Sequence, residues 1–432
     1  MQHEINLKPG FRPKPSRAYR IPEILKPTVE KQIAELVKDG FLVPSKSPVS
    51  SPIVCVLKPN KKDVRIACDY RVVNAGSEDD AYPMPTVDEV FNQMGHAKYI
   101  SVFDAKSGYY QCPLRPSDQW LTAIATPSGL WEWTRMPFGL KGSSATFVRM
   151  VQAILRPIQE FSSSYIDDLA VYTTVGWKMH LQHIQRFLAV VKDAGLTLNL
   201  AKCEFAKGEV KYVGQYIGSG KRRPDPAKLT AILSMTPPTT KKQLRSVLGL
   251  FGYYRPYLQG FAELAKPLTD LTAKTSPATL PWGQTEQQAF DCIKALVANI
   301  TELNIPVVGQ PFQLFTDASG VAVGSCLAQT DEHGVDHPVA YSSQKLTDVQ
   351  TRWSTIERES YAVIVALLKW RDIIFGSHIT VWCDHNPLTY IVSCAPKSAR
   401  LTRWALALQQ YNLTIKYKRG CQNVAADCMS RL

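Results

Sequence analysis

The sequence predicts a mixed α/β protein built from several domains. The chain has 432 residues, which is too long for one ordinary domain. Segments rich in β-branched and aromatic residues alternate with helical patterns in its first and last parts, as in α/β folds. Between residue 219 and about residue 310, segments rich in Pro, Thr and Lys interrupt helical patterns, which indicates a helical region with tethers.

The first part begins with an extended arm, followed by a helix and a hairpin. Residues 8–27 are rich in Pro and Arg, and Pro27 can open a helix. Apolar residues then recur at helical spacing until Gly40. The segments SPIVCVL and VRIACDY flank PNKKD, which predicts a β-hairpin with a basic tip.

Three more segments complete this part of the chain. KYISVFD predicts a strand that ends at Asp104, and SSSYIDDLAVYT, residues 162–173, has two adjacent acids between two β-rich runs. VKYVGQYIG, residues 210–218, is again β-rich. The helix between the last two is predicted from Ile184, Leu188 and Val191 and ends at Gly195.

The last part starts a second α/β pattern. From Pro311, PFQLFTDASGVAVGSCLAQ predicts strands, and STIERESYAVIVALLKWRDII, residues 354–374, predicts a helix. HITVWCD, residues 378–384, is strand-like, and residues 413–432 predict a final strand and helix. Strands that alternate with helices are typical of an α/β domain.

The composition favours a polyanionic partner and a reducing compartment. Fifty Lys and Arg residues against 37 acids give a formal charge of +13, which suits nucleic acid, although it could also be a solubilising surface. Ten cysteines lie scattered without a Cys-x-x-Cys pair, so neither a zinc knuckle nor a disulfide framework is indicated. There is no apolar signal core, and the longest apolar run, AVIVALL, is too short to cross a bilayer, so we expect a soluble protein with no membrane partner.

The adjacent acids Asp167 and Asp168 allow two interpretations. Asp suits a tight hairpin turn, where neither side chain need be buried. Alternatively, a divalent cation such as Mg²⁺ would recruit the carboxylates and relieve their repulsion. Adjacent strands of one sheet could add Asp104 to the pair. Three such carboxylates could bind two Mg²⁺ ions about 3.5 to 4 Å apart for nucleotidyl transfer.

Four motifs resemble one family when they are taken in order. FDAKSGYYQ, RMPFGLKGSSATF, YIDD and VKYVGQYIG resemble the reverse transcriptases of gypsy-type LTR retrotransposons, the Metaviridae. The resemblance extends over the whole chain, and its middle resembles the family's thumb and tether. It implies a right-hand polymerase of fingers, palm and thumb, followed by a ribonuclease H-like domain.

The resemblance assigns roles to individual residues. Asp104, Asp167 and Asp168 would be catalytic metal ligands, and Tyr109 would be the aromatic gate against the ribose 2′-hydroxyl of an incoming nucleotide; a packed aromatic is the alternative. Arg65 would hold the triphosphate, or be an ordinary solvated charge. Phe138 and Gly139 would shape the nucleotide pocket and the template path; without the resemblance, their segment predicts a turn that enters a helix. A primer grip, or otherwise a β-bulge, would be formed by Val213, Gly214 and Gln215.

A second set of acids lies in the last part of the chain. TDAS, TIERES, CDHNPL and NVAADCMSRL resemble the ribonuclease H domain of the same elements. The resemblance makes Asp317, Glu359, Asp384 and Asp427 catalytic ligands of two metal ions. Glu357 competes with Glu359; we prefer Glu359 because it alone precedes the apolar helix at the family's spacing. The segment KRGCQNVAAD lacks the histidine of many retroviral versions, which puts product release by such a histidine in doubt.

The resemblance therefore implies an RNA-directed DNA polymerase, also able to copy DNA, that degrades the RNA strand of the hybrid. Each site would bind two Mg²⁺ ions, with Mn²⁺ as a substitute. The expected domains are fingers and palm (1–218), thumb and tether (219–305) and a ribonuclease H-like domain (306–432). The chain would be the middle of a polyprotein.

The expected partners are an RNA template, a DNA primer, the RNA/DNA hybrid and dNTPs, while association of two copies is left open. The expected location is a cytoplasmic virus-like particle, with the nucleus as a second location. Two alternatives remain. One is a reverse transcriptase from a related retrovirus or pararetrovirus. The other is an inactive, domesticated scaffold that binds nucleic acid.

Overall fold

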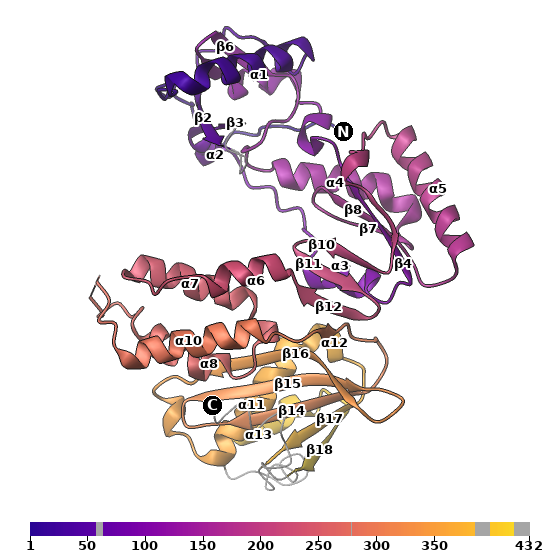
Figure 1. Ribbon diagram of the computed structural model, residues 1–432, viewed down its shortest axis with the longest axis vertical. Helices are drawn as coiled ribbons and strands as arrows, with labels where there is room; N and C mark the ends of the chain where they lie inside the picture. The colour runs from indigo at the N-terminus through magenta and orange to yellow at the C-terminus, as the bar shows by residue number, and fades with distance from the viewer. Residues whose placement is uncertain (58–63, 278, 385–397, 419–432) are drawn as a thin grey trace. The chain divides into compact units, whose positions relative to one another are not determined.

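The computed structural model describes residues 1–57, 64–277, 279–384 and 398–418 (Figure 1). The chain divides into two compact units, Met1–Val213 and Gly214–Leu432, and each is described by itself. Within the described ranges, no helix is both long and apolar enough to cross a membrane.

The first unit contains a five-stranded sheet near its N-terminus, in the order β1-β6-β5-β2-β3. Its strands are β1 (Leu42–Pro44), β2 (Ser51–Leu57), β3 (Val64–Cys68), β5 (Ile124–Thr126) and β6 (Gly129–Trp133). Strands β2 and β3 pair antiparallel, as predicted, while the basic tip between them lies outside the described residues. Helix α1 (Lys26–Lys38) packs Val29 and Ile33 into this core, and Gly40 follows with a φ of 72°.

A four-stranded sheet, β7-β8-β4-β9, forms the rest of this unit (Figure 1). Its strands are β4 (Tyr99–Asp104), β7 (Ser162–Tyr165), β8 (Asp168–Thr173) and β9 (Glu204–Lys207), and β10 (Glu209–Tyr212) follows. The helices are α2 (Arg71–Gly76), α3 (Val87–Met94), α4 (Ser143–Leu155) and α5 (Trp177–Asp193), with short 3-10 turns at η1 (Glu23–Leu25), η2 (Gly108–Gln111), η3 (Pro116–Thr122), η4 (Arg156–Ile158) and η5 (Leu200–Lys202). Phe103, Phe147 and Phe187 are fully buried where α4 and α5 cover the sheet.

The predicted helix before Gly195 is confirmed as α5, but one of its expected core residues is not in the core. Leu188 is 39% exposed, whereas Phe187 and Val191 are buried. His180 is also buried, and its two ring nitrogens are satisfied by hydrogen bonds with Ser101 and Thr173 of the sheet at 2.9 Å. The buried face of α5 thus includes the polar residue His180, whereas apolar spacing alone had placed Leu188 on that face.

The second unit begins with a helical region. Strands β11 (Gln215–Gly218), β12 (Lys221–Pro224) and β13 (Leu303–Asn304) pair antiparallel in sequence order. Between β12 and β13 lie α6 (Pro226–Leu233), α7 (Lys241–Tyr253), η6 (Arg255–Tyr257), α8 (Phe261–Leu264), α9 (Lys266–Asp270) and α10 (Gln284–Ala298). Leu244, Phe251 and Phe290 form part of one buried cluster. The prediction of helices separated by Pro-rich segments is therefore confirmed.

A mixed five-stranded sheet follows, in the order β16-β15-β14-β17-β18 (Figure 1). The strands are β14 (Phe312–Ala318), β15 (Ala322–Thr330), β16 (Asp336–Lys345), β17 (Ile379–Cys383) and β18 (Leu413–Tyr417); the helices are η7 (Gln350–Arg352), α11 (Thr355–Lys369), α12 (Arg371–Ile374) and α13 (Ala399–Leu408). Strands β14, β17 and β18 are parallel. In chain order, α11 and α12 lie between β16 and β17, and α13 lies between β17 and β18. The helix predicted after β18 lies outside the described residues.

Candidate active sites

Asp167 and Asp168 lie at the turn between β7 and β8, as the hairpin interpretation requires. Ile166, within this turn, has a φ of 55°, a conformation that a β-branched residue rarely adopts. Asp168 is the first residue of β8 and is directly opposite Asp104, the last residue of β4, in the antiparallel register. The sheet therefore brings the three acids to the same end of two neighbouring strands, and the turn and metal interpretations are compatible.

These acids repel one another, and one lysine offsets part of the repulsion. The pKa of Asp168 is raised to about 6, first by burial and then by the charges of Asp167 and Asp104, whereas Lys202 lowers it. The Nζ atom of Lys202 lies 3.3 Å from the Asp104 carboxylate. Since Asp167 is exposed and Lys202 is 65% exposed, solvent reaches this site.

Two residues that hold this site were not predicted from the sequence. Lys202 comes from the segment before β9, and Tyr212 ends β10. The Tyr212 side chain is 1% exposed, and its hydroxyl donates to the main-chain oxygen of Asp168 at 2.8 Å. The sequence around neither residue indicates its contact with the acids, because each contact depends on how distant strands pair.

The predicted gate residue Tyr109 lies in η2, five positions after Asp104, and contacts two other aromatic rings. Its ring centroid is 4.9 Å from that of Phe138 and 5.5 Å from that of Phe147. Its hydroxyl lies 2.8 Å from Oγ of Ser144. Phe138 is 47% exposed, so this group of rings is open to solvent on one side.

Two other predicted substrate residues lie in the first unit. Arg65 belongs to β3, but its side chain is outside what the structure describes. Gly139 has a φ of 96°, and a Cβ atom there would lie 3.2 Å from the main-chain oxygen of Cys68. Gly139 is therefore required by backbone conformation and by close packing.

The predicted primer grip is a tight turn after β10. Val213 and Gly214 have φ values of 48° and 77°, which two-residue turns of type I′ require at both central positions. The Gln215 side chain is 7% exposed: its oxygen accepts a hydrogen bond from the Tyr257 hydroxyl at 2.6 Å, and its amide lies 3.3 Å from the Tyr253 hydroxyl. The side-chain amide of Gln215 is thus bonded to tyrosines of the second unit.

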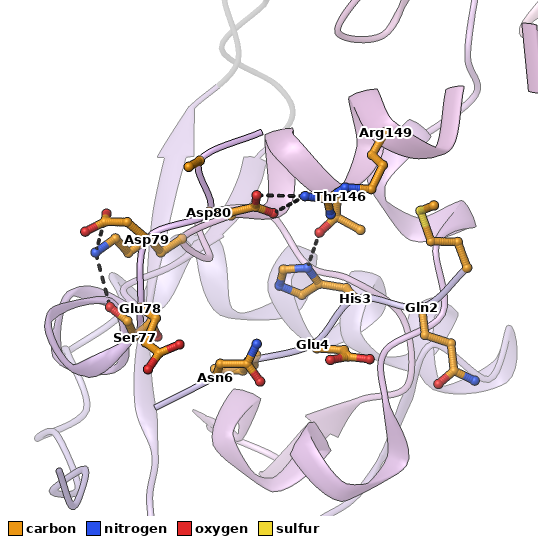
Figure 2. Close-up of a pocket in the computed structure, with 15 residues that line it drawn as sticks. Gln2, His3, Glu4, Asn6, Ser77, Glu78, Asp79, Asp80, Thr146 and Arg149 are labelled. Atoms are coloured by element: carbon orange, nitrogen blue, oxygen red, sulfur yellow. Dashed lines mark hydrogen bonds and ion pairs between the residues drawn. The ribbon is translucent and has the colours of Figure 1, made fainter. Parts of the chain in front are cut away.

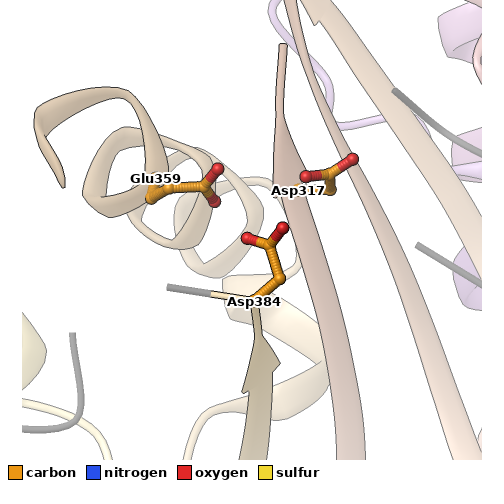
Figure 3. A group of neighbouring side chains, drawn as sticks. All are labelled: Asp317, Glu359 and Asp384. Carbon is orange, nitrogen blue, oxygen red and sulfur yellow. The ribbon is translucent and has the colours of Figure 1, made fainter. Parts of the chain in front are cut away.

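The second group of acids is gathered at one edge of the mixed sheet (Figure 3). Asp317 lies in β14, Asp384 directly follows β17, and Glu359 projects from α11 toward both. Each offers a carboxylate oxygen, and these oxygens all lie within 4.8 Å of one another. Parallel pairing of β14 with β17 explains why the two aspartates share an edge. Asp427 lies outside the described residues.

Glu359 is buried against like charges. It is 3% exposed, and its pKa is raised to about 9, first by burial and then by Asp317 and Asp384. Its Oε2 atom has no hydrogen-bond partner within the described part of the chain. Such a donor set of carboxylate oxygens fits a hard divalent cation, which would neutralise the charge that burial penalises.

Glu357, the competing glutamate, has a different environment. It closes the capping box of α11 by accepting the main-chain NH of Ser354 at 3.1 Å. Its other carboxylate oxygen forms an ion pair with Arg400 at 3.0 Å. The structure therefore places Glu359, and not Glu357, beside Asp317 and Asp384.

A polar pocket of about 460 Å³ lies elsewhere in the first unit (Figure 2). Two of its acids are paired with cations: Asp80 binds Arg149 through both oxygens at 2.7 and 2.9 Å, and Asp79 pairs with Lys141 at 2.7 Å. His3, at the centre of the pocket, bonds Thr146, and burial lowers its pKa to about 4. These pairings make the pocket a connected polar network rather than a set of repelling acids.

Comparisons with known proteins agree with the order of the two acidic groups. Residues 56–217 match the family described as reverse transcriptase (RNA-dependent DNA polymerase), and residues 308–411 match the RNase H-like domain found in reverse transcriptase. The chain is 36% identical to the retrovirus-related Pol polyprotein from transposon opus and 32% identical to that from transposon gypsy, both of Drosophila melanogaster, over 96% of this chain. It spans only 43% and 41% of those two polyproteins.

Solved structures show the same arrangement of elements. A foamy viral protease-reverse transcriptase in complex with double-stranded DNA matches with a TM-score of 0.86 at 25% identity, over 96% of this chain and 74% of that one. Another, with the RNA/DNA hybrid, matches with a TM-score of 0.77 at 25% identity, over 96% of this chain and 56% of that one. The predicted resemblance and the predicted multidomain fold class are thereby confirmed.

Proposed function

The chain combines a domain of the reverse transcriptase family with an RNase H-like domain of the kind found in reverse transcriptases, and we propose that it copies RNA into DNA and degrades the RNA strand of the hybrid. DNA serves as a second template. The observation that carries this proposal is the presence of two separate groups of acids, each at the end of paired strands.

In the first group, Asp104, Asp167 and Asp168 are the catalytic ligands. In the second, Asp317, Glu359 and Asp384 have this role, together with Asp427. Reverse transcriptases and RNases H generally use divalent metal ions, and Mg²⁺, with Mn²⁺ as a substitute, is the proposed ion for both sites. When bound, two such ions would activate the attacking oxygen and stabilise the leaving oxygen. The acids hold charge in fixed positions, and Lys202 balances part of it before an ion binds.

The remaining predicted residues bind the substrate. Tyr109 closes the sugar side of the nucleotide pocket, beside Phe138, whose exposed ring supports this assignment. Gly139 allows close backbone approach, and Arg65 holds the triphosphate. The turn of Val213, Gly214 and Gln215 positions the primer end through its backbone.

The partners follow from charge and from the relatives. The formal charge of +13 suits an RNA template, a DNA primer and their hybrid, and the foamy viral enzymes were solved with double-stranded DNA and with an RNA/DNA hybrid. dNTPs are the proposed monomers, and a homodimer is left open. The proposed domains remain 1–218, 219–305 and 306–432, and the proposed location is a cytoplasmic virus-like particle, with the nucleus second.

One assay tests both activities and separates an enzyme from a nucleic-acid scaffold. A labelled DNA primer is annealed to a differently labelled RNA template, and both strands are sized after incubation with dNTPs and Mg²⁺ or with a chelator. We expect primer extension and RNA shortening with Mg²⁺ and neither with the chelator. Binding of the hybrid without extension or cleavage would support the scaffold and overturn the proposal.

A further inference from the structure

Helix α4 holds Tyr109 at two points. The first is the ring, which packs against Phe147 at 5.5 Å with an interplanar angle of 70°. Phe147 is fully buried and lies under Gly108, where an added Cβ would come within 2.8 Å of it. The preceding glycine therefore lets Tyr109 reach the helix.

The second point is the hydroxyl. It lies 2.8 Å from Oγ of Ser144, and either oxygen can donate. Ser144 is the second residue of α4, three positions before Phe147, so both side chains lie on one face of the helix. Gly142, with a φ of 79°, precedes the helix and starts this turn.

The contact between the Tyr109 hydroxyl and Ser144, called the hydroxyl tether below, has a consequence at the tip of the ring. A tyrosine hydroxyl can both donate and accept, so it can bond the Ser144 hydroxyl in either direction. The χ2 angle of tyrosine is broad, so packing on one side leaves the ring some freedom. A partner at the hydroxyl restricts the ring and occupies the polar group.

We propose that Ser144 is a positioning residue for nucleotide selection: it holds the Tyr109 hydroxyl so that the ring stands as an apolar wall against the 2′-hydroxyl of a ribonucleotide. This inference rests on the proposed polymerase function. Ser144 does not touch the reacting atoms in this role. It acts through Tyr109.

The test compares the ratio of kcat/KM for a dNTP to that for the matching rNTP, because a ratio cancels differences in the active fraction of enzyme. Ser144→Ala is expected to lower the ratio about threefold to tenfold, the size of one net hydrogen bond. Tyr109→Phe removes the same bond from the other side, and it should lower the ratio by a similar factor. The double variant should show no further loss.

Two controls separate the hydroxyl tether from general damage. Ser144→Thr keeps a hydroxyl and should retain most of the parental ratio. Ser128→Ala removes another exposed hydroxyl pair of the same unit, Thr126 with Ser128 at 3.1 Å, and should leave the ratio unchanged. Thermal unfolding of each variant checks that it folds.

Each other outcome is decisive. If Tyr109→Ala lowers the ratio but Ser144→Ala does not, the hydroxyl tether is wrong and the proposed function stands. If Ser144→Ala lowers the ratio but Tyr109→Phe does not, Ser144 acts by another route and the inference is overturned. If the parent chain makes no DNA, the proposed function falls and the inference falls with it.

Discussion

The two groups of acids offer the same kind of ligand but keep it under different conditions. At the four-stranded sheet β7-β8-β4-β9, Asp167 is exposed, Lys202 neighbours Asp104, and the pKa of Asp168 is raised to about 6. At the mixed sheet, Glu359 is 3% exposed and its pKa is raised to about 9. Without a cation, ionising the buried acid therefore costs more free energy at the second site than at the first.

The difference follows from the elements that carry the acids. A hairpin turn and strand ends leave the first group partly in water, where solvent and a flexible lysine reduce the repulsion. A helix that packs on a sheet carries Glu359 into a buried position beside two aspartates. We therefore expect ion binding to contribute more to folding stability at the second site than at the first.

The largest expected effect tests whether the two sites work separately. Asp104→Asn removes one charged ligand and should reduce DNA synthesis at least about a hundredfold, while RNA cleavage persists. Asp193→Asn, which removes an exposed acid at the end of α5, is the charge-matched control and should leave both activities near the parental level. Primer extension and RNA sizing measure the two activities. Substantial synthesis by a folded Asp104→Asn chain would remove Asp104 from the catalytic group.

The next prediction tests which of the two glutamates of α11 acts in RNA cleavage. Glu359→Gln should reduce RNA cleavage about a hundredfold or more, because it removes charge from the group with Asp317 and Asp384. Glu357→Gln should mainly weaken the helix cap and the Arg400 ion pair, with an effect on cleavage of only a few-fold. Equal losses of cleavage at unchanged hybrid affinity would contradict the assignment. DNA synthesis should persist in both variants.

A third prediction concerns stability without metal. The folded pKa of Glu359, about 9, lies above its unfolded value of about 4.3, so the native state holds more protons between these values. The free energy of unfolding should therefore fall as pH rises through this window. Glutamine cannot ionise, and Glu359→Gln should gain on the order of 2–4 kcal/mol over the parent in chelator at about pH 8, and little at about pH 5.

Denaturant unfolding with and without Mg²⁺ measures this difference. Added Mg²⁺ should stabilise the parent and shrink the advantage of the variant, because a bound ion favours the native state. Glu357→Gln is the matched control and should show no such gain with pH. The free energy of unfolding of the parent in chelator could instead rise between about pH 5 and about pH 8 relative to that of Glu359→Gln. That result would show that folding does not raise the pKa of Glu359.

The smallest expected effect tests the lysine of the first site. Lys202 lowers the pKa of Asp168, so Lys202→Met should raise it and move the acid limb of DNA synthesis upward, by about half a pH unit because the lysine is largely exposed. Lys207→Met, also exposed and in β9, is the control. Superimposable pH profiles for the parent and Lys202→Met would mean that Lys202 does not act on these acids in solution.

Some features of the protein were determined by short stretches of sequence. Alternating patterns and turn residues correctly predicted that Asp104 ends a strand, that Asp167 and Asp168 occupy a turn, and that Asp384 follows a strand. Strand alternation, helix periodicity and turn chemistry depend on neighbours along the chain, so they can be recognised without a structure. Ordered motifs likewise sufficed for the resemblance and the order of the domains.

Only the tertiary structure decided which side chains meet. TIERES offers two glutamates, and their fates differ because Arg400 reaches Glu357 while packing of α11 carries Glu359 to Asp317. Helical spacing placed Leu188 in the core, yet packing left it exposed. The contacts of Lys202, Tyr212 and Ser144 join segments that are far apart in sequence. The pKa shifts of Asp168 and Glu359 arise from burial and from charges on other segments. Such quantities are set by packing in three dimensions, which local sequence patterns do not contain.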